Sequence, residues 1–272
     1  MFIDSHCHLS FPELREQIPA ILDAMQQAQV DRAICISTKL EEFDTVHALA
    51  MDHAPLWSTV GVHPDEAEVQ EPTLDDLLAR AALPRVVGIG ETGLDYYRLN
   101  GRSVADMEWQ RERYRTHIQA GRQTGLPLVI HTRSASDDTL AILREAGGFG
   151  SGASDGLPVS RGVFHCFTET EAVARAALDL DFYISFSGIL TFRNAADLRE
   201  VARFVPLERT LIETDSPYLA PVPHRGKTNN PSLVPFVAQQ IAEIKGLPVE
   251  EVARVTSANT EHLFDRMMAQ AC

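Results

Sequence analysis

Six short hydrophobic runs in this chain of 272 residues each end in histidine or carboxylate side chains. These side chains are His6 and His8 in the first run, then His63, Glu91, His131, His165 and Asp215. A short apolar run bounded by turn residues is typical of a strand buried on both faces. Barrel enzymes build their active sites from polar residues at the C-terminal tips of such strands. The pattern therefore predicts an enzyme that uses a bound metal.

The first two candidates form an H-x-H motif on one predicted strand. Spacing by two residues places the His6 and His8 imidazoles on the same face, where both can hold one ion. Asp4 shares this face one step deeper, and either orients a ligand or makes a core hydrogen bond.

Glu91 ends an uncharged run, VVGIG, in which an ionised carboxylate costs several kcal/mol unless it is compensated. Metal coordination supplies that compensation, and two carboxylate oxygens can bridge two cations about 3.5–4 Å apart. His131 and His165 add imidazole donors that suit zinc, manganese or iron. Asp215 completes the set, as a ligand and as an acceptor for a proton from water. Its neighbour Glu213 shares its face, two residues deeper.

Three further groups are candidates for contact with the substrate. His63, in the motif GVHP, lies at the height of the ligands and is expected to contact substrate or a leaving group. Arg133 follows His131 by two residues, so its guanidinium can hold an anionic oxygen. The loop His224–Pro231 offers Arg225, Lys227 and Asn229, either as a phosphate-binding cluster or as a solvated basic turn.

Predicted strands and helices alternate along the whole chain. Strands are expected near 1–5, 32–37, 56–61, 86–90, 127–131, 162–166, 181–186 and 210–214. Helices are expected near 13–29, 40–53, 73–82, 104–124, 136–146, 169–179, 195–204, 231–245 and 248–268, the last being one tail helix or a pair. This order predicts a (β/α)8 TIM barrel, with a doubly wound open sheet as the rival. Ligands on the first, third, fourth, fifth, sixth and eighth strands converge only in a closed barrel, so a single barrel domain spanning 1–272 is favoured.

Composition limits the other possibilities. The net charge of −14 disfavours a protein that coats nucleic acid, although bound cations can still serve a phosphodiester substrate. No run has the length of a membrane helix and no leader precedes the first strand, so we expect a cytoplasmic protein. The sequence does not fix the oligomeric state, for which a monomer is the expectation. Four scattered cysteines predict free thiols, and strand alternation is expected to turn Cys7 and Cys166 away from the ligands. The glycine-rich loop 147–160 is expected on the face opposite the site, without a catalytic role.

The motifs DSHCHL, GVHP, GETGLDYY, HTR, FHCFTE, ETDSPYL and HRGKTNNP, in this order, resemble those of the TatD-related metal-dependent hydrolases. The resemblance covers essentially the whole chain and implies a two-metal deoxyribonuclease in a TIM barrel. It implies that His6, His8, Glu91 and Asp215 hold one ion. Glu91, His131 and His165 would hold the other, with Glu91 bridging, and His63 would face the substrate.

The leading hypothesis is a divalent-metal-dependent deoxyribonuclease of the 3′–5′ exonuclease type, acting on DNA ends or small phosphodiesters. The alternative is an amide or ester hydrolase, for instance one that deacylates aminoacyl-tRNA, because the same metals polarise a carbonyl group. A non-enzymatic metal scaffold is disfavoured, since structural zinc sites are closed and rich in cysteine. Zinc, magnesium and manganese all remain open as the metal.

Overall fold

The computed structural model describes residues 1–149 and 156–269. Its centre is an eight-stranded sheet in which every strand pairs in parallel with the next along the chain. The strands are β1 (Phe2–Cys7), β2 (Val30–Cys35), β3 (Leu56–Val60), β4 (Val86–Asp95), β5 (Leu128–Arg133), β6 (Gly162–Phe164), β7 (Tyr183–Phe186) and β8 (Thr210–Ile212). A parallel bridge between Cys7 and Ser216 joins the two ends of the sheet. Backbone hydrogen bonds from Asp215 N to His6 O and from His8 N to Ser216 O strengthen this closure.

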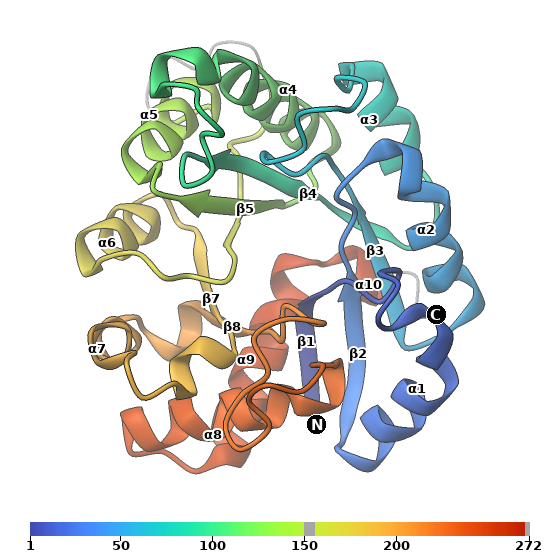
Figure 1. Ribbon diagram of the computed structural model, residues 1–272, viewed down its shortest axis with the longest axis vertical. Helices are drawn as coiled ribbons and strands as arrows, with labels where there is room; N and C mark the ends of the chain where they lie inside the picture. Colours follow the sequence, from blue (N-terminus) through green and yellow to red (C-terminus); the bar gives the residue numbers. More distant parts are fainter. Residues whose placement is uncertain (150–155, 270–272) are drawn as a thin grey trace.

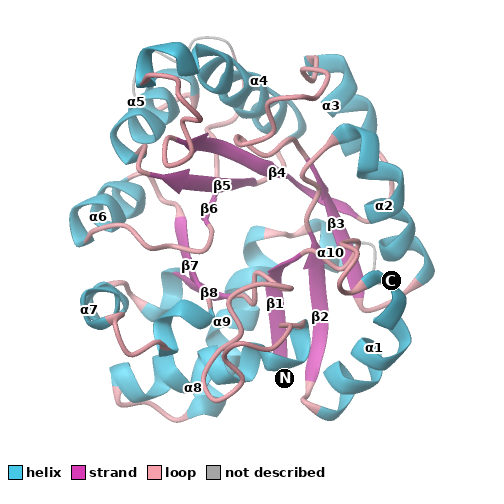
Figure 2. Ribbon diagram, viewed as in Figure 1, coloured by secondary structure: helices cyan, strands magenta, loops and turns pink. Residues whose placement is uncertain are grey.

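Helices surround the ring of strands on the outside (Figure 1). They are α1 (Ile18–Gln27), α2 (Phe43–Asp52), α3 (Leu74–Ala81), α4 (Glu108–Thr124), α5 (Ser136–Ala146), α6 (Glu171–Asp179), α7 (Ala196–Phe204) and α8 (Val234–Lys245), followed by the tail pair α9 (Val249–Leu263) and α10 (Arg266–Ala269). The alternation of strand and helix, visible in Figure 2, is that of a (β/α)8 barrel, and the predicted fold class is confirmed. Within the described parts of the chain, no helix has both the length and the apolar character needed to cross a membrane.

Two apolar layers hold the barrel together. The inner layer takes one buried side chain from each strand: Ile3, Ile34, Trp57, Val87, Val129, Val163, Tyr183 and Leu211. Phe264, which lies between α9 and α10, and Met267, in α10, join this layer. The larger outer layer lies between strands and helices and includes Phe43, Tyr114 and Phe186. Because every strand is covered on both sides, the strands appear in the sequence as continuous apolar runs.

The strand β4 differs most from its prediction. It was expected to end at residue 90, yet it continues through Asp95, and all ten of its residues are buried. Glu91 therefore lies within the strand rather than at its tip. The strand passes close to β3 at this point, because a Cβ on Gly61 would lie 2.4 Å from the carbonyl carbon of Gly90. Gly61 thus lets the backbone that carries Glu91 approach β3.

The glycine-rich loop 147–160 can be placed only in part. Its ends connect α5 to the N-terminal end of β6, which is the face opposite the strand tips, as expected. Residues 150–155 lie outside the described residues.

Candidate metal centre

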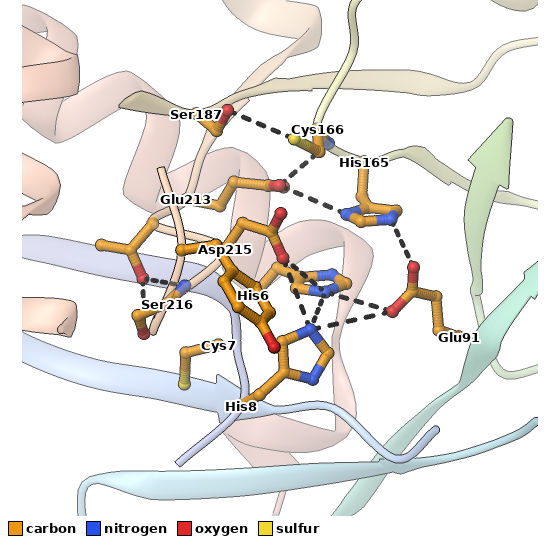
Figure 3. A network of polar contacts seen from close by, with 12 residues as sticks. His6, Cys7, His8, Glu91, His165, Cys166, Ser187, Glu213, Asp215 and Ser216 are labelled. Atoms are coloured by element: carbon orange, nitrogen blue, oxygen red, sulfur yellow. Dashed lines mark hydrogen bonds and ion pairs between the residues drawn. The ribbon is translucent and has the colours of Figure 1, made fainter. Parts of the chain in front are cut away.

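Four predicted ligands from three strands converge on one point at the C-terminal face (Figure 3). His6 Nε2 lies 3.1 Å from His8 Nε2, 3.4 Å from Glu91 Oε2 and 3.6 Å from Asp215 Oδ1. His8 Nε2 lies 3.4 Å from the same Asp215 oxygen and 3.9 Å from Glu91 Oε2. We call these four residues the first donor set.

The first donor set fits a cation. A tetrahedral ion with bonds of about 2.0–2.1 Å holds its ligand atoms about 3.3 Å apart, close to the spacing observed here. When both rings carry their protons on Nδ1, both Nε2 lone pairs face this point and can hold one cation. Burial, followed by the nearby His165, lowers the pKa of His6, which keeps the ring neutral and its lone pair available.

The other oxygen of Glu91 faces a different group of imidazoles. Glu91 Oε1 lies 2.8 Å from His165 Nε2 and 3.3 Å from His131 Nδ1. We call Glu91 Oε1, His131 and His165 the second donor set. Since the two carboxylate oxygens point to separate sets, the geometry is that of a bridging ligand.

Two carboxylates fix the tautomers of the second donor set. Asp95 Oδ2 accepts a hydrogen bond of 3.0 Å from His131 Nε2, which leaves the His131 Nδ1 lone pair directed at Glu91. Glu213 Oε1 accepts from His165 Nδ1 at 3.3 Å and from the backbone N of Cys166 at 2.9 Å. Such carboxylate–histidine pairs are a regular part of metal sites, where they orient the ring and raise its basicity.

His63 also approaches Glu91 Oε1, at 3.3 Å through Nε2. The donor atoms of His63, Glu91 and His131 lie within 4.8 Å of one another, so distance alone would allow His63 to be a ligand. Its tautomer argues otherwise. The backbone N–H of Asp65 donates to His63 Nδ1 at 3.0 Å, so a neutral ring must carry its proton on Nε2. His63 therefore presents a donor to the cavity where His131 and His165 present lone pairs.

The electrostatics of the centre favour a bound cation. Burial opposes ionisation of Glu91, but the nearby His165 and His63, together with the polar contacts with His131 and His165, outweigh it and hold the Glu91 pKa well below its usual range. Burial likewise opposes ionisation of Asp215, yet the hydrogen bond with His8 and the nearby His6 lower its pKa. Both acids are thus ionised at neutral pH, in a site that little solvent reaches.

A cavity of about 780 Å³ opens over the donors. Arg133 lines it, and its guanidinium lies 3.7 Å from the centre of the Tyr97 ring. Arg98 also lines the cavity and was not identified in the sequence. Cys166 lines it as well, and the expectation that this side chain points away is wrong. β6 ends at Phe164 and Cys166 has φ +41°, so the alternation of a regular strand no longer applies.

The loop His224–Pro231 contributes less than expected. None of its residues is among the described residues that line the cavity. Arg225 and Lys227 are exposed, and the guanidinium of Arg225 stacks 3.8 Å from the centre of the Phe192 ring. Asn229 is fully buried and its amide donates to Thr214 O at 2.9 Å and to Tyr218 O at 2.7 Å. The prediction that Asn229 binds substrate is corrected, because both of its N–H groups already hold the backbone after β8.

Two roles were predicted for Asp4, orienting a ligand or making a core hydrogen bond, and the structure shows the core hydrogen bond. Its Oδ1 accepts from the backbone N of Thr214 at 2.9 Å and of His6 at 3.2 Å, and its Oδ2 accepts from Thr214 Oγ1 at 2.5 Å. Burial raises the pKa of Asp4 to about 8. The side chain joins β1 to the end of β8 and touches no imidazole ring.

An eight-stranded α/β barrel with histidines and carboxylates gathered at its C-terminal face has the architecture of the metal-dependent hydrolases. The family described as TatD related DNase matches residues 3–265. The chain therefore belongs to this family and is a metal-dependent hydrolase that uses a divalent metal.

Individual relatives agree with this assignment. The protein named "Uncharacterized metal-dependent hydrolase YcfH" of Escherichia coli K12 is 44% identical over 266 residues, which cover 96% of this chain and 95% of that protein. The "3'-5' ssDNA/RNA exonuclease TatD" of Citrobacter rodentium is 33% identical over 243 residues, covering 87% and 88% of the two chains. The crystal structure of the Escherichia coli TatD homologue YjjV superposes with a TM-score of 0.85 at 28% identity, covering 97% of this chain and 98% of that one.

Proposed function

We propose that this protein is a two-metal nuclease that removes nucleotides from the 3′ end of single-stranded DNA. The observation that carries the proposal is the split of Glu91, whose Oε2 faces the first donor set while Oε1 faces the second. Two ions about 3.5–4 Å apart are the usual device for displacement at phosphorus. A relative named as a single-stranded DNA and RNA exonuclease, at 33% identity, supports the phosphodiester as the bond that is cleaved.

His6, His8, Glu91 and Asp215 would hold one ion, and Glu91, His131 and His165 the other. Divalent ions bound there would polarise the phosphoryl group and lower the pKa of a bound water to about 7. The remaining chemistry belongs to the side chains of this chain.

Asp215 is placed to accept the proton of the attacking water. It lies at the edge of the cavity, about one-sixth exposed, with its pKa lowered so that it is ionised at neutral pH. His63 can donate a hydrogen bond to the leaving oxygen, because Nε2 carries the hydrogen and the residue lines the same cavity. On this proposal the His63 N–H stabilises the negative charge that develops on the leaving oxygen, which takes its proton from solvent, and the Arg133 guanidinium holds a phosphate oxygen.

The test is the release of nucleotides from end-labelled single-stranded DNA by the purified protein. Chelated protein should be inactive, and magnesium, manganese or zinc added singly should restore trimming from the 3′ end. Asp215→Asn should abolish trimming. A 5′-labelled strand should shorten stepwise, whereas a 3′-labelled strand should lose its label in the first step.

Two outcomes would contradict the proposal. If DNA stayed intact with every metal tested while a carboxylic ester was cleaved rapidly, the protein would be a carbonyl hydrolase instead. Trimming that persists in Asp215→Asn would point to a contaminating nuclease.

A further inference from the structure

The cavity above the donors has two unlike walls. One wall carries charge: Arg98 and Arg133 line it together with Asp65 and Glu66, all from the ends of β3, β4 and β5. The other wall is apolar, and its side chains are Phe11, Ile189, Tyr218 and Leu219. They follow β1, β7 and β8, which are neighbours on the opposite side of the barrel. We call these four side chains the apolar wall.

The apolar wall begins directly beside the first donor set. The Phe11 ring stacks on the His8 imidazole, with 4.7 Å between ring centres and 19° between planes. Tyr218 meets Phe11 edge to face at 6.3 Å, and 52% of Tyr218 is exposed. An aromatic surface therefore lies only one side chain away from a group that is bound to the donors.

The Tyr218–Leu219 segment is held in place rather than free. Tyr218 N donates to Asp215 O at 3.1 Å, and Tyr218 O accepts from buried Asn229. Leu219 has φ +57°, a conformation that costs about 1–2 kcal/mol for a residue with a side chain. Gly188 permits it, because a Cβ there would lie 2.0 Å from Leu219 O. Backbone strain maintained by surrounding contacts is typical of positions that grip a ligand.

We propose that the apolar wall binds the nucleobase adjacent to the scissile phosphate. This inference rests on the proposed nuclease function. With a phosphate at the donors, the neighbouring part of a nucleotide is its sugar and base, whose flat apolar face matches exposed aromatic side chains. Tyr97 is not among the described residues that line the cavity, and Arg133 already covers its ring at 3.7 Å, so it does not serve in the same way. Stacking accepts every base, so the wall selects nucleotides without selecting sequence.

The experiment compares thymidine 5′-monophosphate with 2-deoxyribose 5-phosphate, which lacks only the base, by calorimetric titration of the full chain with manganese present. The ratio of their dissociation constants is the contribution of the base. We expect a ratio of about tenfold or more for the unaltered protein. Tyr218→Ala should bring the ratio close to one, while Tyr218→Phe, which keeps the ring, should preserve it.

Tyr97→Ala is the matched control, since it removes an exposed tyrosine that contacts Arg133 but is not among the described residues lining the cavity. It should change both dissociation constants alike and leave their ratio unaltered. Equal affinities for the two ligands in the unaltered protein would overturn the inference, as would a ratio that Tyr97→Ala reduces as much as Tyr218→Ala. If the ratio behaves as expected but no oligonucleotide is trimmed, the base site stands and the nuclease proposal fails.

Discussion

The two donor sets around Glu91 are built differently. In the second set, each imidazole has a carboxylate behind it: Asp95 holds His131 and Glu213 holds His165. In the first set, the Nδ1 atoms of His6 and His8 are buried and have no hydrogen-bond partner among the described residues.

This difference has a consequence for the ions. A carboxylate partner fixes the ring and makes it a stronger base, and loss of such a partner typically costs 10–100-fold in metal affinity. We therefore expect the second set to retain its ion more firmly, and the first set, next to Asp215, to exchange its ion more readily.

The largest effect is expected for substitution of Glu91, which belongs to both donor sets. Glu91→Gln removes the charge shared by both, so metal content should fall to one ion or fewer per chain and turnover should drop by on the order of 10³-fold or more. Elemental analysis after gel filtration measures the first quantity, and nucleotide release the second. Retention of two ions by Glu91→Gln would show that the carboxylate does not bridge.

His63→Asn tests the imidazole that presents an N–H to the cavity, whereas His131 and His165 present lone pairs. The asparagine keeps an acceptor for the Asp65 N–H but removes the Nε2 donor, so turnover should fall by about 10²-fold with metal content unchanged. A nitrophenyl ester of thymidine 5′-phosphate, whose leaving group is stable as an anion, should be far less affected. A parallel loss of one ion would instead assign His63 to the second donor set.

Asp95→Asn and Glu213→Gln test the asymmetry itself. Each removes a charge behind one imidazole, and the firmly held ion should bind about 10–100-fold more weakly, measured by competition with a chromophoric chelator. Asp4→Asn is the control, because Asp4 is equally buried but touches only backbone groups and a threonine hydroxyl. If Asp4→Asn weakened binding to the same extent, general destabilisation rather than support of the rings would explain the loss.

Sequence reasoning selected side chains that the fold brings together, because their signal is local. A polar residue at the end of a buried apolar run is improbable without a function, and alternation along a strand places His6 with His8. The barrel followed from strand and helix alternation, and from the need to bring six dispersed strands together.

Asp95 was missed, whereas Cys166 and Asn229 were named but given the wrong direction or role. Asp95 lies four residues beyond Glu91 on the same strand and therefore on the same face. A prediction that extended β4 past Gly93 would have identified it. The direction of Cys166 depends on one backbone angle, and the role of Asn229 depends on carbonyl groups 11 and 15 residues earlier in the chain. Neither the Cys166 angle nor the Asn229 contacts are visible in a local pattern.

His117 represents a third kind of imidazole, and its substitution is expected to have the smallest effect. His117, on α4, is fully buried, donates from Nδ1 to Arg113 O at 2.8 Å and accepts at Nε2 from Val62 N at 3.0 Å. Both nitrogens are satisfied by backbone, so no lone pair is left for a metal. Burial, together with the charge of Arg113, lowers the pKa of His117 to about 4, against a hydrogen bond that raises it.

Because the folded protein keeps His117 neutral, the unfolded chain takes up a proton first as the pH falls below about 6.5, and stability is lost down to about pH 4. Between pH 7 and pH 5.5 this group alone should remove about 1 kcal/mol from the free energy of unfolding. His117→Gln cannot be protonated, so its stability relative to the unaltered protein should improve by that amount over the same interval. Urea unfolding of chelated protein at both pH values measures the difference, and a difference independent of pH would show that His117 does not carry the acid sensitivity.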